Sequence, residues 1–417
     1  MNDQSSPAHP ALPAALEGIR VCDLTRILAG PTCTQLLGDL GADVIKIEKP
    51  LAGDDTRKWG PPYVKDAQSQ ETTESAYYLS ANRNKRSVAI DIATDDGQKL
   101  IRQILKHCDI LVENYKVGGL AKYGLSYENL KDEYPRLIYC SITGFGQTGP
   151  YAHRAGYDYL AQAMSGLMSI TGHPETGPVK VGVGVADLLT GIYANVAILA
   201  ALRHRDRTGE GQHLDLALLD CQVSWLVNEG TNYLLSGKAP PLLGDQHANI
   251  VPYKVVPASD GQFILAIGND HQFQKFCTLA RKSELADDPR FKTNSARVKN
   301  RAACNAAVEA ATITRTRDEW LTALDQLGVP AGPLCTLDQV FADPQVQHRD
   351  GKITMPYPQA KSGTISLLGN PIHANKTPPT YRRAPPTLGQ HTDEVLADIL
   401  QMPASSIAQL RKKGVIE

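Results

Sequence analysis

Short apolar runs alternate with helical stretches along the first half of the chain. Residues 19–24 form an apolar run, residues 32–40 have helical character and end at Gly41, and residues 44–48 predict a second strand. The pattern repeats, with a predicted helix at 97–107 and predicted strands at 87–92, 110–113 and 137–143. This alternation predicts an α/β fold with a Rossmann-like, doubly wound parallel sheet, which binds ligands at the carboxyl ends of its strands.

The second half begins with a strong helix at 188–205, apolar along one face, and a predicted strand at 213–219. The pattern then becomes irregular, and residues 260–267 and 318–327 predict a smaller α+β unit. Prolines between residues 376 and 389 predict an extended strap, followed by one last helix at 392–401. The predicted organisation is a disordered lead-in (1–15), a large Rossmann-like domain (16–224), a linker with a small α+β domain (225–330), and a return to the large domain (331–417).

The amino-acid composition argues against nucleic acid and membranes as binding partners. Lys and Arg total 43 and Asp and Glu total 44, so no field of one sign draws the chain toward nucleic acid or an anionic membrane. No apolar run reaches the roughly 18 residues of a membrane span, and the first residues lack the features of a targeting peptide. Eight scattered cysteines, without a C-x-x-C pair, are typical of reduced thiols. These features together predict a cytoplasmic protein, and they leave a small anionic ligand open.

The segment from Gly144 to Gly149 reads G-x-G-x-x-G and follows a predicted strand. In a dinucleotide site these glycines open a helix whose N-terminus holds a pyrophosphate. Here Pro150 and a polar stretch without periodicity follow instead, and the first β-α turn lacks the fingerprint. The motif therefore favours a glycine-rich loop near a ligand over an NAD or FAD site.

Asp187 ends the segment Val-Gly-Val-Gly-Val-Ala-Asp, directly before the apolar helix. An aspartate at this place commonly caps the helix. A carboxylate beside glycines can also act as a nucleophile toward an acyl group, with backbone N–H groups stabilising the charge that develops. The pattern alone leaves both interpretations open.

In combination these segments resemble the family III CoA-transferases, a group that includes formyl-CoA transferase, carnitine CoA-transferases and alpha-methylacyl-CoA racemase. The matching blocks run almost from end to end and lie, in order, at residues 16–25, 28–31, 38–48, 82–87, 112–115, 182–187, 329–333 and 388–396. The resemblance implies an interlocked homodimer that takes acyl-CoA and carboxylic acid substrates.

The resemblance also implies that Asp187 is the nucleophile. The aspartate attacks the donor thioester to give an acyl-aspartyl anhydride, CoA thiolate returns to form an aspartyl-CoA thioester, and the acceptor carboxylate completes the exchange. CoA is thus a co-substrate, and neither a metal nor NAD is required. The positions that match CoA-binding residues of the family are Leu28, Ala29, Lys49, Ile90, Asn114, Tyr115, Lys122, Thr143, Gly144 and Phe145.

Two departures guide the choice within the family. Racemases carry His in the position of Tyr157, and a tyrosine is a poor base at neutral pH. Formyl-CoA transferase has Gln in the position of Leu28. The segments at residues 52–57, 59–62, 74–80, 138–144, 146–150, 154–158 and 250–253 resemble the succinyl-CoA:glutarate type. This resemblance implies a dicarboxylic acid substrate, and Arg26, Arg57, Arg83 and His247 are candidates to bind its distal carboxylate. The alternatives are a racemase-type isomerase and a catalytically silent CoA-thioester binding protein.

Overall fold

The computed structural model describes residues 14–417, which form two compact units. The first unit contains the chain up to residue 165 together with residues 182–225 and 344–417. The second contains residues 166–181 and 226–343. Nearly all of the predicted lead-in at 1–15 lies outside the described residues. The pattern of apolar positions did not indicate that residues 166–181 group with the second unit, or that the chain returns to the first unit only at residue 344.

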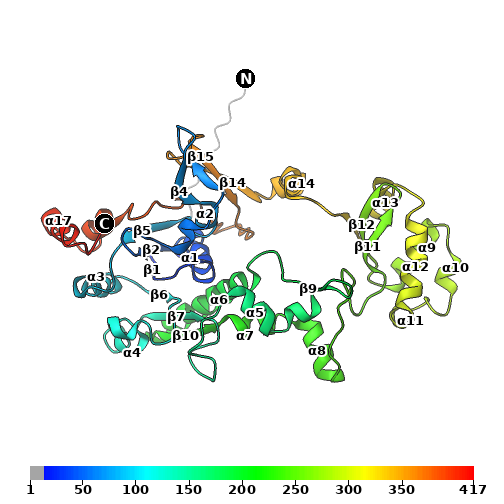
Figure 1. The fold of residues 1–417 in the computed structure, drawn as a ribbon, viewed down its shortest axis with the longest axis horizontal. Helices are drawn as coiled ribbons and strands as arrows, with labels where there is room; N and C mark the ends of the chain where they lie inside the picture. Colours follow the sequence, from blue (N-terminus) through cyan, green and yellow to red (C-terminus); the bar gives the residue numbers. More distant parts are fainter. Residues whose placement is uncertain (1–13) are drawn as a thin grey trace. The chain divides into compact units, whose positions relative to one another are not determined.

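A six-stranded sheet forms the centre of the first unit (Figure 1). Its strands are β1 (Arg20–Asp23), β2 (Asp43–Glu48), β5 (Lys85–Ala89), β6 (Ile110–Glu113), β7 (Ile138–Thr143) and β10 (Gln212–Ala217). They pair in the order β10-β7-β6-β1-β2-β5, and every pair is parallel. This is the Rossmann order, whose direction of winding reverses between β1 and β6. The predicted fold class is confirmed.

Helices cover both faces of this sheet. On one face α1 (Ala29–Asp39) and α6 (Val185–Thr208) pack against inward residues such as Val21, Val112 and Ile138. On the other face lie α3 (Asp95–Leu105), α16 (Thr392–Asp398) and α17 (Ala404–Lys412). Strand residues alternate between the two cores, as expected for a sheet buried on both sides.

The C-terminal segment differs from its prediction in one respect. The helix predicted at 392–401 ends at Asp398, and a further helix, α17, follows Pro403. The proline-rich strap contains no helix or strand between residues 376 and 389. It is held to the sheet by Asn84, which accepts hydrogen bonds from the backbone N–H groups of Arg382 and Arg383 and donates one to the carbonyl of Thr380.

The first unit also contains smaller elements outside the six-stranded sheet. They are η1 (Asp55–Lys58), β3 (Tyr63–Lys65), β4 (Glu71–Ser75), α2 (Ala76–Ser80), η2 (Ala121–Tyr123), α4 (Tyr127–Leu130), α5 (Asp158–Met164), α7 (Leu218–Ser224), α15 (Pro344–His348), β14 (Lys352–Pro356) and β15 (Thr364–Leu368).

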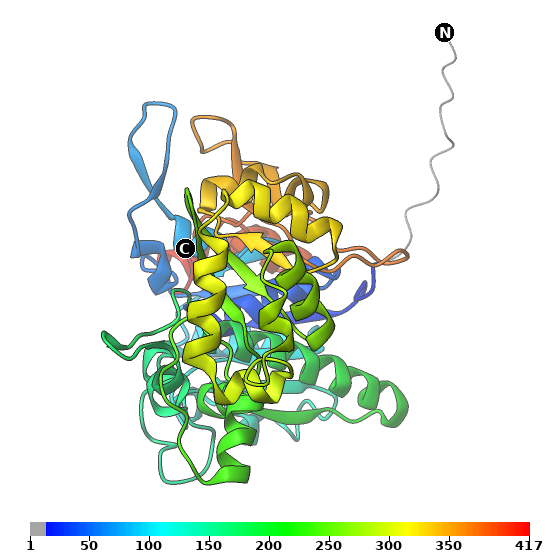
Figure 2. The same cartoon turned by 90° about the vertical axis from the view of Figure 1, so that its right-hand side faces the viewer.

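The second unit is built on the antiparallel sheet β11-β12-β13. Its strands are β11 (Tyr253–Ala258), β12 (Gly261–Ala266) and β13 (Ala331–Pro333), and the helices on it are α9 (Asp270–Leu279), α10 (Glu284–Asp287), α11 (Asn294–Lys299), α12 (Arg301–Thr312) and α13 (Arg317–Gln326). Figure 2 views this unit with its helices in front of the strands. Phe263, Phe276 and Trp320 are fully buried between the layers. The remaining elements are η3 (Leu167–Ile170), β8 (Gly172–His173), β9 (Gly177–Pro178), α8 (Val227–Ser236) and α14 (Leu337–Ala342).

Within residues 14–417, α6 is the one helix long and apolar enough by composition to cross a membrane. Its apolar window is 56% buried against the rest of the protein, and core helices of soluble proteins pass the same test. Its length and composition are therefore weak evidence of a membrane span.

Candidate active site

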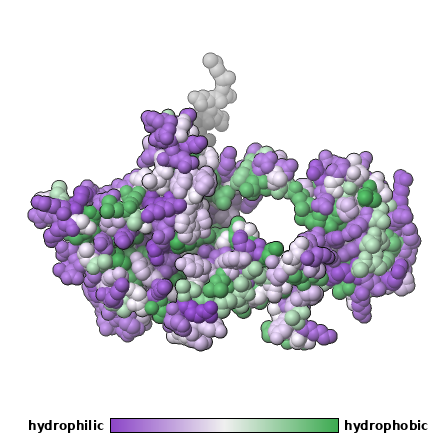
Figure 3. Space-filling view, viewed as in Figure 1, coloured by the Kyte–Doolittle hydropathy of each residue, from purple (hydrophilic) through white to green (hydrophobic). Residues whose placement is uncertain are grey.

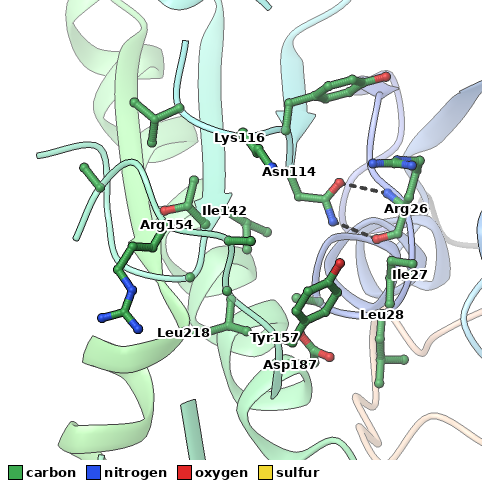
Figure 4. A pocket seen from close by; sticks show the side chains of 18 of the residues that line it. Arg26, Ile27, Leu28, Asn114, Lys116, Ile142, Arg154, Tyr157, Asp187 and Leu218 are labelled. Atoms are coloured by element: carbon green, nitrogen blue, oxygen red, sulfur yellow. Dashed lines mark hydrogen bonds between the residues drawn. The ribbon is translucent and has the colours of Figure 1, made fainter. Parts of the chain in front are cut away.

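A cavity of about 250 Å³ lies at the carboxyl edge of the sheet, where the winding reverses between β1 and β6. Loops after β1, β6 and β7 and the first turn of α6 supply its walls (Figure 4). Eight of the residues singled out from the sequence line it: Arg26, Leu28, Ala29, Asn114, Tyr115, Thr143, Gly144 and Asp187. The topology thus brings together residues that lie up to 161 positions apart in the chain.

Asp187 does not cap α6. The helix begins at Val185 with Gly184 as its N-cap, so the helix-cap interpretation is wrong. Among the described residues no donor hydrogen bonds to the Asp187 carboxylate, which faces the cavity. Burial, and secondly the charge of Asp158, raises the pKa of Asp187 from 3.8 to about 7. A carboxylate that is desolvated and free of donors is well suited to attack an electrophile.

Asp158, at the start of α5, holds the turn that leads into Asp187. Its Oδ1 accepts a hydrogen bond from the Ala186 N–H at 2.8 Å, and its Oδ2 accepts one from Gln162 Nε2 at 2.7 Å. A Cβ placed on Gly184 would lie 3.7 Å from both Asp158 Cγ and Asp187 Oδ2. The two carboxylates are therefore close neighbours, and Asp158 both caps α6 and disfavours the charged form of Asp187.

The loop between β1 and α1 forms the opposite wall. Leu28 is the N-cap of α1 and has no side-chain acceptor, so the first turn of this helix carries no side-chain cap. Leu28 and Ala29 line the cavity together with Asp187. The positive end of α1 is consequently available to a developing negative charge in the cavity.

The glycine-rich loop after β7 packs closely against the segment that precedes α5. A Cβ on Gly144 would lie only 2.4 Å from the Cα of Gly156, so neither glycine leaves room for a side chain. The next helix, α5, begins at Asp158, nine residues after Gly149. The loop therefore lacks the helix that a dinucleotide motif places directly after its glycines.

A second cavity, of about 430 Å³, shares Arg26, Asp55 and Tyr115 with the first. Lys49 and Ile90, two of the residues expected to bind CoA, line it. Two others line neither cavity. Lys122 Nζ lies 4.7 Å from the ring centre of Tyr123, and the Phe145 ring lies beneath the Arg154 guanidinium, 5.2 Å away.

Three of the four residues expected to bind the distal carboxylate do not line this cavity. Arg57 is buried and donates to the carboxylates of Glu48 and Glu74. Arg83 is buried and donates to Asp39. His247 belongs to the second unit. Both guanidinium groups are buried and already form ion pairs with carboxylates of the protein. Arg57 and Arg83 are therefore poor candidates to bind a substrate.

Arg26 alone of the four lines the cavity, together with two further cations, Lys116 and Arg154. Arg26 forms an ion pair with Asp55 at 2.7 Å. Arg154 contacts the rings of Phe145 and Tyr151 and forms no ion pair within residues 14–417. The same residues contain no group of three or more His, Cys, Asp or Glu side chains that could hold a metal ion.

Asp158 and Arg154 are the site residues that sequence reasoning missed. Both belong to the segment Arg154-Ala-Gly-Tyr-Asp158, in which only Tyr157 was weighed. Tyr157 lines the cavity and is 66% exposed. The position of Asp158 next to that tyrosine could have drawn attention to it. The neighbouring sequence does not show that its carboxylate reaches the first turn of α6, 28 residues further along the chain.

Comparison with known proteins adds three findings. The sequence model of CoA-transferase family III matches residues 16–392. "Succinate--glutarate CoA-transferase" of Agrobacterium fabrum is 50% identical over 92% of this chain and 95% of its own, and human "Succinyl-CoA:glutarate CoA-transferase" is 44% identical over 96% and 90%. The crystal structure of a CAIB/BAIF family protein from Brucella suis superposes with a TM-score of 0.81 at 49% identity, covering 93% of this chain and 99% of that one.

Proposed function

Because the chain belongs to CoA-transferase family III, we propose that it transfers CoA from succinyl-CoA to glutarate or a close dicarboxylic analogue through Asp187. The enzyme class follows from the family, and the two acids come from the names of the relatives. The observation that carries the proposal is the position of Asp187, whose carboxylate faces the cavity at the winding reversal and bonds to no donor among the described residues.

The chemistry begins with attack of a carboxylate oxygen of Asp187 on the thioester carbonyl of succinyl-CoA. The C–S bond breaks, leaving an aspartyl-succinyl anhydride and CoA thiolate. The thiolate then attacks the aspartyl carbonyl, which releases succinate and leaves an aspartyl-CoA thioester. Glutarate attacks this thioester in turn, and the returning thiolate forms glutaryl-CoA and restores the carboxylate. Each step consumes one activated acyl bond and makes another, so the exchange is balanced without ATP.

Different residues of the site support different steps of this reaction. The uncapped first turn of α1 can stabilise the oxyanion of each tetrahedral intermediate. We assign the nucleotide part of CoA to the second cavity, which shares Arg26 and Tyr115 with the first and is lined by Lys49 and Ile90. Leu28 and Tyr157 flank Asp187, and their bulk supports exclusion of water from intermediates that hydrolyse readily (Figure 4).

For the distal carboxylate of the acid we propose Arg154 in addition to Arg26. Arg154 lines the cavity and forms no ion pair with any residue that the structure describes, whereas the Arg26 guanidinium is already paired with Asp55. CoA exchange from succinyl-CoA to glutarate, compared with a monocarboxylic acceptor such as butyrate, tests the proposal. We expect Arg154→Gln to raise the KM for glutarate and to leave the KM for butyrate unchanged. Wild-type protein that transfers CoA to no dicarboxylic acid would contradict the proposed function.

We further propose that the protein is an interlocked homodimer in a reducing, cytoplasmic compartment. Figure 3 shows apolar patches, drawn in green, among the polar surface. The first unit exposes apolar side chains along α6 and at the end of α7: Ile192, Tyr193, Val196, Leu199, Val223 and Trp225. The second unit exposes Val227, Tyr233, Leu234 and Leu235 on α8. Patches of this extent favour a protein partner. None of the eight cysteines is in a disulfide, which supports the compartment. A monomeric mass in sedimentation equilibrium would contradict the dimer.

A further inference from the structure

The turn between β1 and α1 contains a residue in an unfavourable conformation. Ile27 has φ of 73°, in the left-handed region that β-branched residues rarely adopt. Such a conformation persists only where the surroundings enforce it, and it is frequent at functional sites. The two residues that follow, Leu28 and Ala29, line the cavity with Asp187. The conformation of Ile27 therefore sets where this wall of the cavity lies.

Asp54 contacts the strained residue directly. Its Oδ1 accepts a hydrogen bond from the Ile27 N–H at 3.2 Å, while its Oδ2 accepts one from Lys46 Nζ at 2.9 Å. Lys46 Nζ also donates to the carbonyl of Thr25 at 2.8 Å. The side chains of Lys46 and Asp54 are fully buried. One buried ion pair thus binds the backbone on both sides of Arg26.

The rest of the turn is fixed from the other side. Asn114, which follows β6, accepts a hydrogen bond from the Arg26 N–H and donates one to the Arg26 carbonyl (Figure 4). At the far end of the turn, Leu28 Cδ2 lies 3.0 Å from the position that a Cβ of Gly184 would take. The Leu28 side chain therefore packs against the segment that carries Asp187.

We propose that Asp54 is a positioning residue for the transfer reaction: with Lys46 it holds Ile27 in the left-handed conformation and so keeps Leu28 and Ala29 against Asp187. The inference rests on the proposed function, since it assigns the turn to the wall that meets the thioester. Asp54 itself does not touch the reacting atoms.

Three variants, all made in a Lys46→Met protein, distinguish the effect of the hydrogen bond from Ile27 N–H to Asp54 from the effect of the Asp54 charge. Lys46→Met avoids leaving an unpaired buried ammonium group. Added Asp54→Asn keeps an acceptor for the Ile27 N–H, whereas added Asp54→Ala removes it. Adding Ile27→Gly to the latter lowers the cost of the positive φ, because glycine adopts that conformation without strain, so the turn depends less on the lost acceptor. A matched control is Asp39→Ala with Arg83→Met, which deletes another buried ion pair that does not contact the turn.

The measurements are kcat and KM for CoA exchange. We expect the Ala variant to lose about 100-fold in kcat relative to the Asn variant, which carries the same Lys46→Met change, as small misplacements do. Ile27→Gly should recover about tenfold of that loss. A loss in the Ala variant no larger than that of the control, or no recovery with Ile27→Gly, would overturn the proposal. If the Ala variant fails to fold, rapid exchange of the Ile27 amide in the Asn variant would overturn it.

Amide hydrogen exchange gives a readout that does not depend on substrate. The Ile27 amide should be protected in wild type and in the Asn variant and should exchange rapidly in the Ala variant. Equal protection in all three would overturn the proposal even if the substrates were misassigned. If wild type showed this protection but no transfer from succinyl-CoA, the proposed substrates would fail and the role of Asp54 in holding the turn would stand.

Discussion

Replacing Asp158 with Asn should lower the pKa of Asp187. Asp158 is the only charged group whose field acts on Asp187 to raise that pKa, within the part of the chain that the structure describes. Asn keeps an oxygen that can accept the hydrogen bond from the Ala186 N–H. The substitution therefore removes a negative charge near the nucleophile while leaving the cap of α6 in place.

The size of the effect follows from the geometry. Asp158 Cγ and Asp187 Oδ2 each lie 3.7 Å from one point, the position of a Gly184 Cβ, so they are separated by no more than twice that distance. Two unit charges about 7 Å apart interact by roughly 2.4 kcal/mol at an effective dielectric constant of 20, equivalent to about 1.7 pH units. Both residues are partly exposed, so screening reduces the expected shift to about one pH unit.

The assay is the pH dependence of kcat/KM for CoA exchange between pH 5 and 9. Because Asp187 attacks as a carboxylate, wild-type activity should fall as the pH drops through about 7. In Asp158→Asn this acid limb should move to lower pH by about one unit. Asp215→Asn serves as a control, since that carboxylate accepts from the Gln147 N–H and does not act on Asp187. An acid limb that stays in place, or moves to higher pH, would refute the reasoning.

Two further predictions concern stability. Asp187 has a higher pKa in the folded protein than the ordinary 3.8, so the folded state binds more protons and stability falls as pH rises from about 4 to about 7. Asp187→Asn should therefore stabilise the protein by about 1–2 kcal/mol at pH 8 and by little at pH 4, measured by denaturant unfolding; equal effects at both pH values would contradict this. Gly144→Ala should cost about 2–3 kcal/mol and lower the Tm, because its Cβ would meet the backbone of Gly156. Gly261→Ala, where a Cβ meets nothing within 4 Å, should be nearly neutral, and a Gly144→Ala protein as stable as that control would refute the packing argument.

Much of the fold could be predicted because each element carries its own periodic signal. The apolar runs of β1, β2, β6 and β7 are short and bounded by turn residues, and crossover helices follow them at the expected spacing. The helix α17 was missed because it is short and largely polar, with only Ile407 buried, so its pattern carries little apolar periodicity.

The site was harder to predict because the charge of a residue and its position near a loop do not show which side chain it pairs with. Arg57 and Arg26 look alike in the sequence, yet Arg57 pairs with Glu48 in the interior while Arg26 reaches the cavity. Asp187 posed the same difficulty, since an aspartate near a helix start fits a cap or a nucleophile. Only the tertiary structure distinguishes the two roles: Asp158, from another helix, accepts the hydrogen bond from the Ala186 N–H, and no donor within residues 14–417 bonds to the Asp187 carboxylate.

The central claim is that Asp187 forms a covalent bond with the acyl group and then with CoA. Intact-protein mass spectrometry after mixing with succinyl-CoA, followed by hydroxylamine and peptide mapping, tests it directly. We predict an adduct on the wild-type protein that hydroxylamine converts to a hydroxamate at Asp187, and none on Asp187→Ala. Transfer of CoA by wild-type protein without such an adduct, or an adduct of the same kind on Asp187→Ala, would contradict the account.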